Sequence, residues 1–138
     1  MKFPKPQYHS SKSLVHTLDR VFSEFIRLRD SDAEGYCTCI TCGQRFFWKD
    51  GDAGHFIQRD RKATRWDEKN VAAQCKHCNR FRGGEQFIFG KAIDKKYGAG
   101  TADSLKTFSQ ILFKVDNSWL AYHIGFFRAR TKELKKLK

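Results

Sequence analysis

The sequence predicts a mainly helical α+β fold in a single domain, with a small β core held together by a metal ion. Two Cys-x-x-Cys pairs, Cys39/Cys42 and Cys75/Cys78, supply four thiolates at the spacing expected for one tetrahedral structural Zn²⁺. Apolar residues recur every three or four positions on both sides of the cysteine region, which is typical of amphipathic helices. A chain of 138 residues is long enough for one domain with a modest core.

The first 35 residues are expected to form a short arm followed by one helix. Residues 1–9 contain both prolines and are expected to be a flexible arm. Within the segment 10–35, residues 13–29 carry an apolar stripe that predicts an amphipathic helix, and the polar residues 30–35 end it. The stripe consists of Leu14, Leu18, Val21, Phe22, Phe25 and Ile26.

Residues 36–84 form the predicted zinc-bound core. Short strands are expected around residues 45–49 and 53–57, and the Asp50-Gly51 dipeptide between them is a hairpin-turn signal. The two strands are therefore expected to form a hairpin. A short helix should begin near Cys78 and end at Gly83-Gly84.

Residues 85–138 are predicted to form a basic helical part. One helix is expected over residues 85–97, and a second should start at Thr101 and carry apolar residues as far as Val115. A last helix should run from about Ser118 to the end and finish in a tail rich in Lys and Arg. The aromatic residues of these helices are assigned to the core or to a subunit interface, without a chemical role.

Composition limits the partners and the compartment. The 27 Lys and Arg against 15 Asp and Glu give a formal charge of +12 and a pI near 9.7, which favours a polyanionic partner, above all nucleic acid. A surplus of lysine that only keeps a small protein soluble is the alternative. The first residues, Met-Lys-Phe-Pro-Lys-Pro, lack the hydrophobic stretch of a signal peptide, and no apolar run reaches the roughly 18 residues of a transmembrane helix. We therefore expect a cytoplasmic protein without a membrane partner.

The fifth cysteine, Cys37, is not expected to bind the metal. Four of the five cysteines lie in tight pairs, which fits metal binding in a reducing compartment better than a disulfide framework. The knuckle from Cys39 to Gly43 has a glycine that allows the tight turn after the second ligand, so it is the better site. Cys37 should be a packed or free thiol.

The segment between and after the cysteine pairs carries the residue types that a metal-dependent nuclease needs around one phosphate. Such an enzyme must activate a water, hold a divalent ion on the phosphate and neutralise charge on the leaving oxygen. His55, neutral near pH 7, is the candidate general base. Asn79, in the first turn of the helix after the second pair, and the carboxylate of Asp52 are candidate oxygen ligands for Mg²⁺.

Four motifs follow one another in the zinc region, and their order indicates a protein family. They read Cys39-Ile-Thr-Cys42-Gly43, Asp52-Ala-Gly-His55-Phe56, Gln74-Cys75-Lys76-His77-Cys78-Asn79 and Arg82-Gly83-Gly84. Together they resemble the NinG (Rap) recombination proteins of lambdoid phages and, more distantly, HNH or His-Me finger nucleases and the zinc-containing phage endonuclease VII. The helix that ends at Asp30 and the C-terminus rich in Lys and Leu also resemble NinG, so the resemblance covers nearly the whole chain.

The resemblance implies a zinc-stapled ββα-metal (HNH or His-Me finger) core and a structure-specific endonuclease for branched recombination intermediates such as D-loops and Holliday junctions. His55 would be the general base, Asn70 the middle residue of the H-N-H pattern that braces the hairpin loop, and Asn79 a ligand of a catalytic Mg²⁺ or Mn²⁺. The zinc would have only a structural role. A phage origin would place the protein in the cytoplasm of a bacterial host.

The chain departs from the HNH pattern at Gly54. Many of these nucleases place a metal-binding Asp or His directly before the base. Asp52 faces the same side of a strand as residue 54 would, but about 6–7 Å further along it. A bulge at Gly54 would close this gap. Otherwise Asp52 would be an Asx cap in the turn, and the metal would need another ligand.

Six basic residues near the site are candidate DNA contacts. Four lie between His55 and Asn70, where a solvated loop surface is the alternative, and two flank Phe81 beside the second cysteine pair. They are Arg59, Arg61, Lys62, Arg65, Arg80 and Arg82.

The expected activity is hydrolysis of a phosphodiester, leaving 5′-phosphate and 3′-hydroxyl ends. The near two-fold symmetry of a Holliday junction favours a homodimer, and a phage or host recombinase is an expected partner. Two alternatives remain. One is a zinc-ribbon protein that binds branched DNA without cutting it, and the other is an HNH enzyme that nicks duplex DNA at a chosen sequence.

Overall fold

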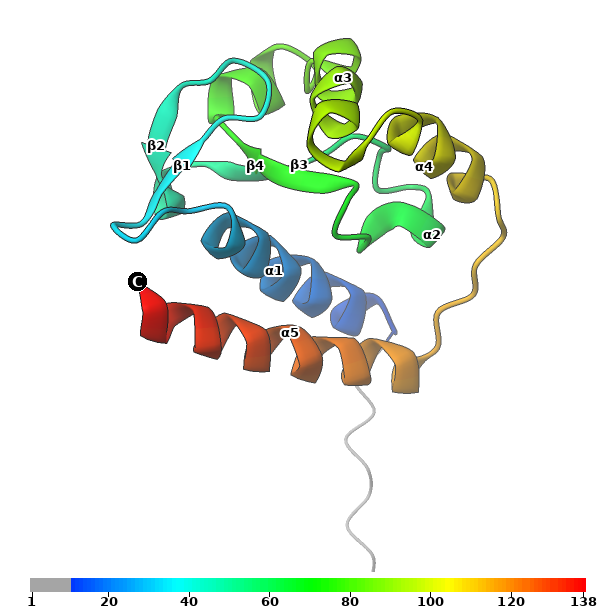
Figure 1. Cartoon of the computed structure of the whole chain (residues 1–138). Helices are drawn as coiled ribbons and strands as arrows, with labels where there is room; N and C mark the ends of the chain where they lie inside the picture. The colour runs from blue at the N-terminus through cyan, green and yellow to red at the C-terminus, as the bar shows by residue number, and fades with distance from the viewer. Residues whose placement is uncertain (1–10) are drawn as a thin grey trace, which may run out of the picture.

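The computed structural model describes residues 11–138, and the expected arm at residues 1–9 lies outside them. Helices α1 and α5 lie on one side of the molecule, α3 and α4 lie on the other, and the small β-sheets lie between them (Figure 1). The arrangement agrees with the predicted mainly helical α+β class. The elements are α1 (Ser11–Arg29), β1 (Tyr36–Thr38), β2 (Arg45–Phe47), β3 (Asp52–His55), α2 (Lys62–Arg65), β4 (Val71–Gln74), α3 (Gln86–Tyr97), α4 (Thr101–Ser109) and α5 (Asn117–Leu137), with a 3-10 turn at Trp48–Asp50 and a π-helical turn, η2, at His77–Phe81.

The largest apolar cluster lies where α1 packs against α5. The apolar stripe predicted for α1 is buried here, and the rings of Phe22 and Phe25 lie with their centroids 4.9 and 5.0 Å from that of Phe127 on α5. The two helices run in the same direction (Figure 1). Trp66, which precedes β4, packs into the same cluster. The helix pair is thereby attached to the polypeptide that forms the candidate site.

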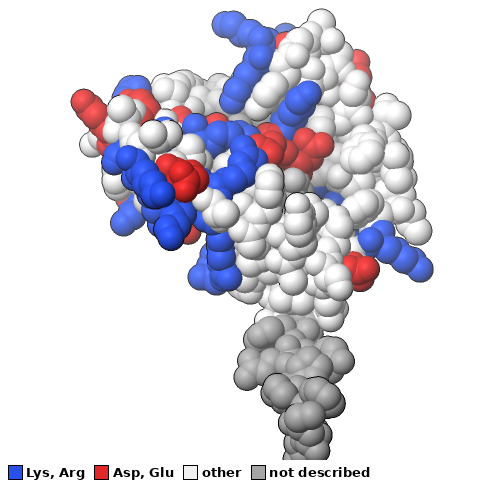
Figure 2. Space-filling model, turned by 60° about the horizontal axis from the view of Figure 1, so that its bottom comes forward, with Lys and Arg blue, Asp and Glu red and all other residues white. Residues whose placement is uncertain are grey.

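The surface of the molecule is unevenly charged. Figure 2 shows Lys and Arg side chains crowded toward the side where α5 ends, and a broad area with few charges beside them. No helix in the described part of the chain is long and apolar enough to span a bilayer. The basic residues of the last three turns of α5 and just beyond are Arg128, Arg130, Lys132, Lys135, Lys136 and Lys138.

The strand pairing corrects the hairpin predicted from the sequence. β1 pairs with β2 and β3 pairs with β4, both antiparallel, so the strands found near residues 45–49 and 53–57 belong to different sheets. A tight hairpin turn at Asp50-Gly51 would need positive φ, but Gly51 is extended with φ −129°. Glycine is needed there for space, because a Cβ would lie 2.1 Å from the ring of Phe46.

The C-terminal helices follow the prediction with one exception. α3 and α5 begin and end within about two residues of their predicted bounds. α4 ends at Ser109, whose hydroxyl donates to the carbonyl of Lys106 at 2.6 Å and competes with the helical pattern. Residues 110–116 are therefore a connection and not the rest of a helix, and Leu112 within it is 91% exposed.

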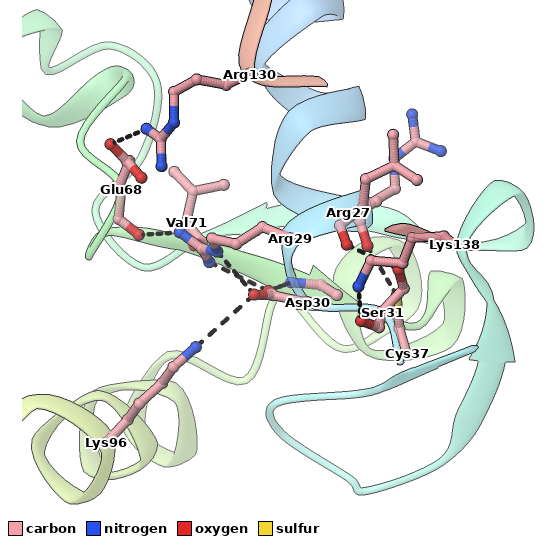
Figure 3. Close-up of polar contacts among 12 residues, drawn as sticks. Arg27, Arg29, Asp30, Ser31, Cys37, Glu68, Val71, Lys96, Arg130 and Lys138 are labelled. Atoms are coloured by element: carbon pink, nitrogen blue, oxygen red, sulfur yellow. Dashed lines mark hydrogen bonds and ion pairs between the residues drawn. The ribbon is translucent and has the colours of Figure 1, made fainter. Parts of the chain in front are cut away.

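A polar junction at the end of α1 holds β4 in place (Figure 3). The guanidinium of Arg29 donates to the carbonyls of Glu68 at 2.7 Å and Val71 at 2.9 Å. The carboxylate of Asp30 accepts from the backbone N–H of Ala73 at 2.8 Å and pairs with Arg29 at 2.8 Å. Because β4 is the partner of β3, this junction fixes the strand that carries Asp52 and His55 relative to α1.

Candidate active site and zinc centre

The four cysteines of the two pairs converge. The Sγ atoms of Cys39, Cys42, Cys75 and Cys78 all lie within 4.8 Å of one another, and those of Cys42 and Cys75 are 3.7 Å apart. Four sulfurs at a Zn–S bond length of about 2.3 Å around a tetrahedral ion lie about 3.8 Å apart, so this spacing suits Zn²⁺. The cluster could therefore hold a zinc ion with no coordination position left for a substrate.

The cysteine cluster joins the β1–β2 hairpin to the turn after β4. Gly43, with φ +78°, closes the first knuckle and donates its N–H to the carbonyl of Cys39 at 2.9 Å. In the second knuckle the carbonyl of Cys75 accepts from the N–H of Asn79 at 3.0 Å. A bound zinc would thus fix the start of η2, and with it the backbone of Asn79.

The thiols differ in their protonation. Burial raises the pKa of Cys78 to about 12. Burial also raises the pKa of Cys39, but hydrogen bonds from Thr41 and from backbone N–H groups outweigh it and bring that pKa to about 6. Cys37 lies outside the cluster, as predicted: it is buried and its Sγ donates to the carbonyl of Arg27 at 3.2 Å. Zinc binds thiolates, so its binding would displace the proton of Cys78.

A pocket of about 760 Å³ opens beside the second knuckle. Asp52 and His55 of β3 line one part of it, and Asn79 and Arg80 of η2 line another. Asp19 of α1 also borders the pocket. Three of the residues predicted to act in catalysis, Asp52, His55 and Asn79, therefore share one cavity, although their elements lie far apart in the sequence.

His55 is held as a neutral imidazole. Its Nε2 lies 2.8 Å from the carbonyl oxygen of Arg65. A carbonyl can only accept, so Nε2 carries the proton and Nδ1 keeps its lone pair. Burial lowers the pKa of His55 to about 4, against the opposing effect of the Arg65 carbonyl. At neutral pH the residue is therefore a base with one nitrogen free to accept a proton.

Asp52 is a hydrogen-bonded carboxylate in the wall of the pocket. Burial raises its pKa, but hydrogen bonds from Arg80 and Asn79 outweigh this effect and leave the pKa lowered. Nε and one Nη of Arg80 donate to its two carboxylate oxygens, both at 2.9 Å. The amide nitrogen of Asn79 donates to the carboxylate at 3.0 Å. Asp52 is the first residue of β3, and these bonds hold it in the pocket and not as a turn cap.

The strand between Asp52 and His55 contains no bulge at Gly54. The β3–β4 register is regular, with Asp52 opposite Gln74. A Cβ at Gly54 would lie 2.0 Å from Oε1 of Gln74, so no side chain fits there. The fully buried amide of Gln74 fills this space and donates to Thr41 at 3.1 Å and to the carbonyl of Gly84 at 2.8 Å.

Asn70 is buried and braces the loop between β3 and β4. Its Oδ1 accepts from the N–H of Ile57 at 2.7 Å, and its Nδ2 donates to the carbonyls of Ile57 and Thr64, both at 3.0 Å. The side chain is 0% exposed and occupied by these bonds, so it is a positioning residue and not a metal ligand. Its contacts hold the loop that supplies the Arg65 carbonyl to His55.

A comparison with known protein families identifies the family of this chain. A model of the family described as Bacteriophage Lambda NinG protein matches residues 1–137. The chain belongs to the NinG family. No curated protein sequence and no solved structure matches it. The NinG match spans the cysteine cluster and the pocket, so both are parts of a NinG chain and not features of an added module.

The basic residues predicted to contact DNA fall into two groups in this NinG chain. Arg65 is largely buried and forms an ion pair with Asp19 of α1 at 2.5 Å, which gives it a structural task. Its guanidinium also donates to the carbonyl of Arg59 at 2.9 Å. The remaining five side chains are exposed around the pocket and its neighbouring loop. They are Arg59, Arg61, Lys62, Arg80 and Arg82.

Three residues in and around the pocket were not predicted from the sequence. Asp19 accepts from Arg65 and from the indole N–H of Trp66 at 3.0 Å, and Gln86 of α3 donates to the carbonyl of His55 at 3.3 Å. Asp19 and Gln86 both lie on polar helix faces, where the sequence does not distinguish them from ordinary solvent-exposed residues. Gln74 had a signal, because it is a polar residue at the end of the apolar run Val71–Gln74.

Proposed function

We propose that this NinG chain is a metal-dependent DNA endonuclease that hydrolyses phosphodiesters in branched recombination intermediates such as D-loops and Holliday junctions. The observation that carries the proposal is the single pocket shared by His55, Asp52 and Asn79. A neutral base next to oxygen ligands, with arginines at the rim, is what phosphodiester hydrolysis requires. The preference for branched DNA rests on the resemblance described above.

His55 acts as the general base. Its Nδ1 takes a proton from a water, and the oxygen of that water forms a bond to phosphorus while the bond from phosphorus to the 3′ oxygen breaks. The 3′ oxygen takes a proton from solvent, so the products are a 5′-phosphate and a 3′-hydroxyl. A pKa of about 4 makes His55 a weak base in the free protein. The negative charge of a bound phosphodiester would raise the pKa toward neutrality.

Asp52 and Asn79 would hold the catalytic Mg²⁺ or Mn²⁺. The donor set suits a hard cation, because a carboxylate and an amide oxygen are its preferred ligands. When bound, the ion would stabilise negative charge on the phosphate and on the departing oxygen. Binding would require the side chain of Asn79 to turn its oxygen toward the ion. It would also require the exposed Arg80 to leave the carboxylate, which would make Arg80 available to the phosphate.

The zinc centre and Asn70 support this site without taking part in chemistry. A closed centre of four thiolates has no free position for water or substrate. Asn70 holds the loop from Ile57 to Thr64, and the cysteines hold η2. For paired nicks in a Holliday junction we propose a homodimer with two such sites, and a phage or host recombinase as partner.

One assay tests the activity. Purified protein with Mg²⁺ is incubated with a Holliday junction, a D-loop, a flap and a matched linear duplex, and nicks are mapped on denaturing gels. We expect cleavage of the branched substrates, reduced about a hundred-fold or more in His55→Ala with unchanged affinity for the junction. His16→Ala, which changes an exposed histidine of α1, is the matched control. Absence of cleavage of every branched substrate by the wild type would refute the proposal.

The ion pair between Arg80 and Asp52 favours a second candidate function. Both carboxylate oxygens are already occupied by Arg80, as they would be in a zinc protein that binds branched DNA without cutting it. Such a protein would bind the junction in the same assay and leave it intact with any divalent ion. Equal cleavage of the linear duplex at one sequence would instead indicate a sequence-directed nicking enzyme.

A further inference from the structure

An exposed aromatic pair lies on η2, the turn whose Asn79 and Arg80 line the pocket. Phe81, the last residue of η2, is 77% exposed. Its ring lies against that of His77, one turn earlier, with the centroids 6.2 Å apart and the planes tilted by 33°. His77 is exposed as well. Neither ring fills the core, so their outer faces are open to a ligand.

Basic residues flank the pair along the chain. The segment 76–82 contains Lys76, Arg80 and Arg82, all exposed, and no Asp or Glu. Arg80 lines the pocket and pairs with Asp52, and Arg82 lies 3.6 Å from Glu85, so the basic segment that carries the aromatic pair also supplies part of the pocket wall. An apolar protein partner would not require this charge, whereas a polyanion with flat apolar groups matches both features.

A third exposed aromatic residue follows the turn after η2. Gly83, Gly84 and Glu85 have φ of 60, 81 and 51°, three consecutive left-handed residues that reverse the chain. Both glycines line the pocket, and nothing lies within 4 Å of a Cβ built at Gly83. The chain then enters α3, where Phe87 is 75% exposed and the Nζ of Lys91 lies 4.4 Å from its ring centroid.

We propose that His77 and Phe81 form a stacking platform for unpaired DNA bases, with Phe87 as a further contact. A base in an intact duplex has both faces covered by its neighbours, whereas an unpaired base offers a free face to an aromatic ring. A strand whose phosphate lies in the pocket would pass beside η2, so its neighbouring bases would come within reach of these rings. The inference rests on the proposed function and makes it more specific: the substrate has unpaired nucleotides beside the scissile phosphate.

The test measures binding without cleavage. The full chain, with its zinc and without added Mg²⁺, is titrated into a fluorescein-labelled oligothymidylate and into a duplex of equal length, and anisotropy is recorded. We expect Phe81→Ala to weaken binding of the oligothymidylate about five-fold or more and binding of the duplex less than about two-fold. Phe81→Trp should keep the affinity, and Phe81→Leu should lose it because leucine is apolar but cannot stack. Tyr122→Ala, a change of another exposed ring on α5, should leave both affinities unchanged.

The outcomes separate this inference from the proposed activity. Equal loss on both probes, no loss on either, or retention by Phe81→Leu would overturn the stacking platform, whether or not the protein cuts DNA. A selective loss on the oligothymidylate would support it even if the wild type cuts no branched substrate. Far-ultraviolet circular dichroism of Phe81→Ala should match the wild type, because the ring is largely outside the core.

Discussion

At the scale of single residues, the carboxylate of Asp52 has two competing uses. Arg80 neutralises Asp52 through two hydrogen bonds, and a divalent ion would neutralise the same oxygens. The arginine is exposed, so its ion pair is weak enough to exchange. In this arrangement Arg80 compensates the charge of Asp52, and under the proposed function a bound metal would release it to the substrate.

This competition predicts that Arg80→Ala binds Mn²⁺ more tightly. The expected gain is several-fold, because the ion would no longer compete with Arg80 for the carboxylate and an exposed ion pair is weak. Titration calorimetry with Mn²⁺ measures it. Arg82→Ala is the control, since it removes the same charge from a neighbouring position whose partner is Glu85 at 3.6 Å. An equal gain in Arg82→Ala would show that only the net charge matters.

The buried His55 predicts sensitivity to acid. Its pKa is about 4 in the folded chain and about 6.5 in the unfolded chain. Between these values the unfolded chain binds a proton that the folded chain does not, so the free energy of unfolding falls as the pH falls through this window. We expect a loss on the order of 3 kcal/mol between pH 7 and pH 4, measured by urea unfolding. His55→Asn should lose less over the same range, and an equal loss would contradict this account.

Gly54 predicts a clash that a second substitution relieves. Gly54→Ala places a Cβ against the buried amide of Gln74, and we expect a destabilisation of about 1–3 kcal/mol in chemical unfolding. Because the clash involves the Gln74 side chain, the loss in Gly54→Ala/Gln74→Ala should be smaller than the sum of the single losses. Gly125→Ala in α5 meets nothing within 4 Å and should stabilise by about 0.5–1 kcal/mol. Additive losses at Gly54 and Gln74 would contradict the clash.

The candidate site was predictable where residue type and spacing carry the chemistry. The four cysteines converge as the Cys-x-x-Cys spacing indicates, and His55, Asp52 and Asn79 reach one pocket. Side-chain contacts between distant segments were not predictable. Arg65, for example, looks like an unpaired cation in the sequence, but in the folded chain Asp19 of α1 lies beside it. The sequence also indicated nothing of Arg80 on Asp52, since that contact depends on how η2 docks against β3.

At the scale of elements, the sequence predicted the long helices and the strands β2 and β3, but it missed β1, β4 and the strand pairing. α1 and α5 have apolar stripes that any packing partner would bury, so their bounds follow from the sequence. β1 and β4 are three and four residues long, too short for a periodicity signal. Their pairing is set by the cysteine cluster and by the Arg29–Asp30 junction, which are contacts between distant segments.

The dependence of these short elements on the cysteine cluster predicts the effect of zinc removal. We expect one zinc per chain, lost in Cys75→Ser and retained in Cys37→Ser, which leaves the cluster intact. Without the ion, β1, β2 and η2 lose their common anchor, and the thermal midpoint should fall by about 10 °C or more, equivalent to about 3 kcal/mol. Metal analysis and calorimetry check both variants. A Cys75→Ser protein with unchanged zinc content would refute the four-thiolate site.

At the scale of the whole molecule, α1 separates two basic regions that one DNA could cross. Asp19 of α1 borders the pocket of His55, while Arg20, the next residue, borders a second hollow with Arg128 and Lys132 of α5. An α-helix with side chains is only about 10–12 Å across. The crowding of Lys and Arg toward the end of α5 therefore lies within reach of a strand that enters the pocket (Figure 2).

This geometry predicts which basic residues set the salt dependence of DNA binding. Each phosphate contact contributes about 0.9 to the slope of log affinity against log salt for duplex DNA. The double variant Arg128→Gln/Lys132→Gln should therefore reduce the slope by up to about 2 and weaken junction binding. Its single-turnover cleavage at saturating protein should stay unchanged, because neither residue borders the pocket of His55. Lys95→Gln/Lys106→Gln removes the same charge from α3 and α4 and should leave the slope unchanged. Equal slopes for the two double variants would mean that the net charge of the protein attracts DNA without direct phosphate contacts at Arg128 and Lys132.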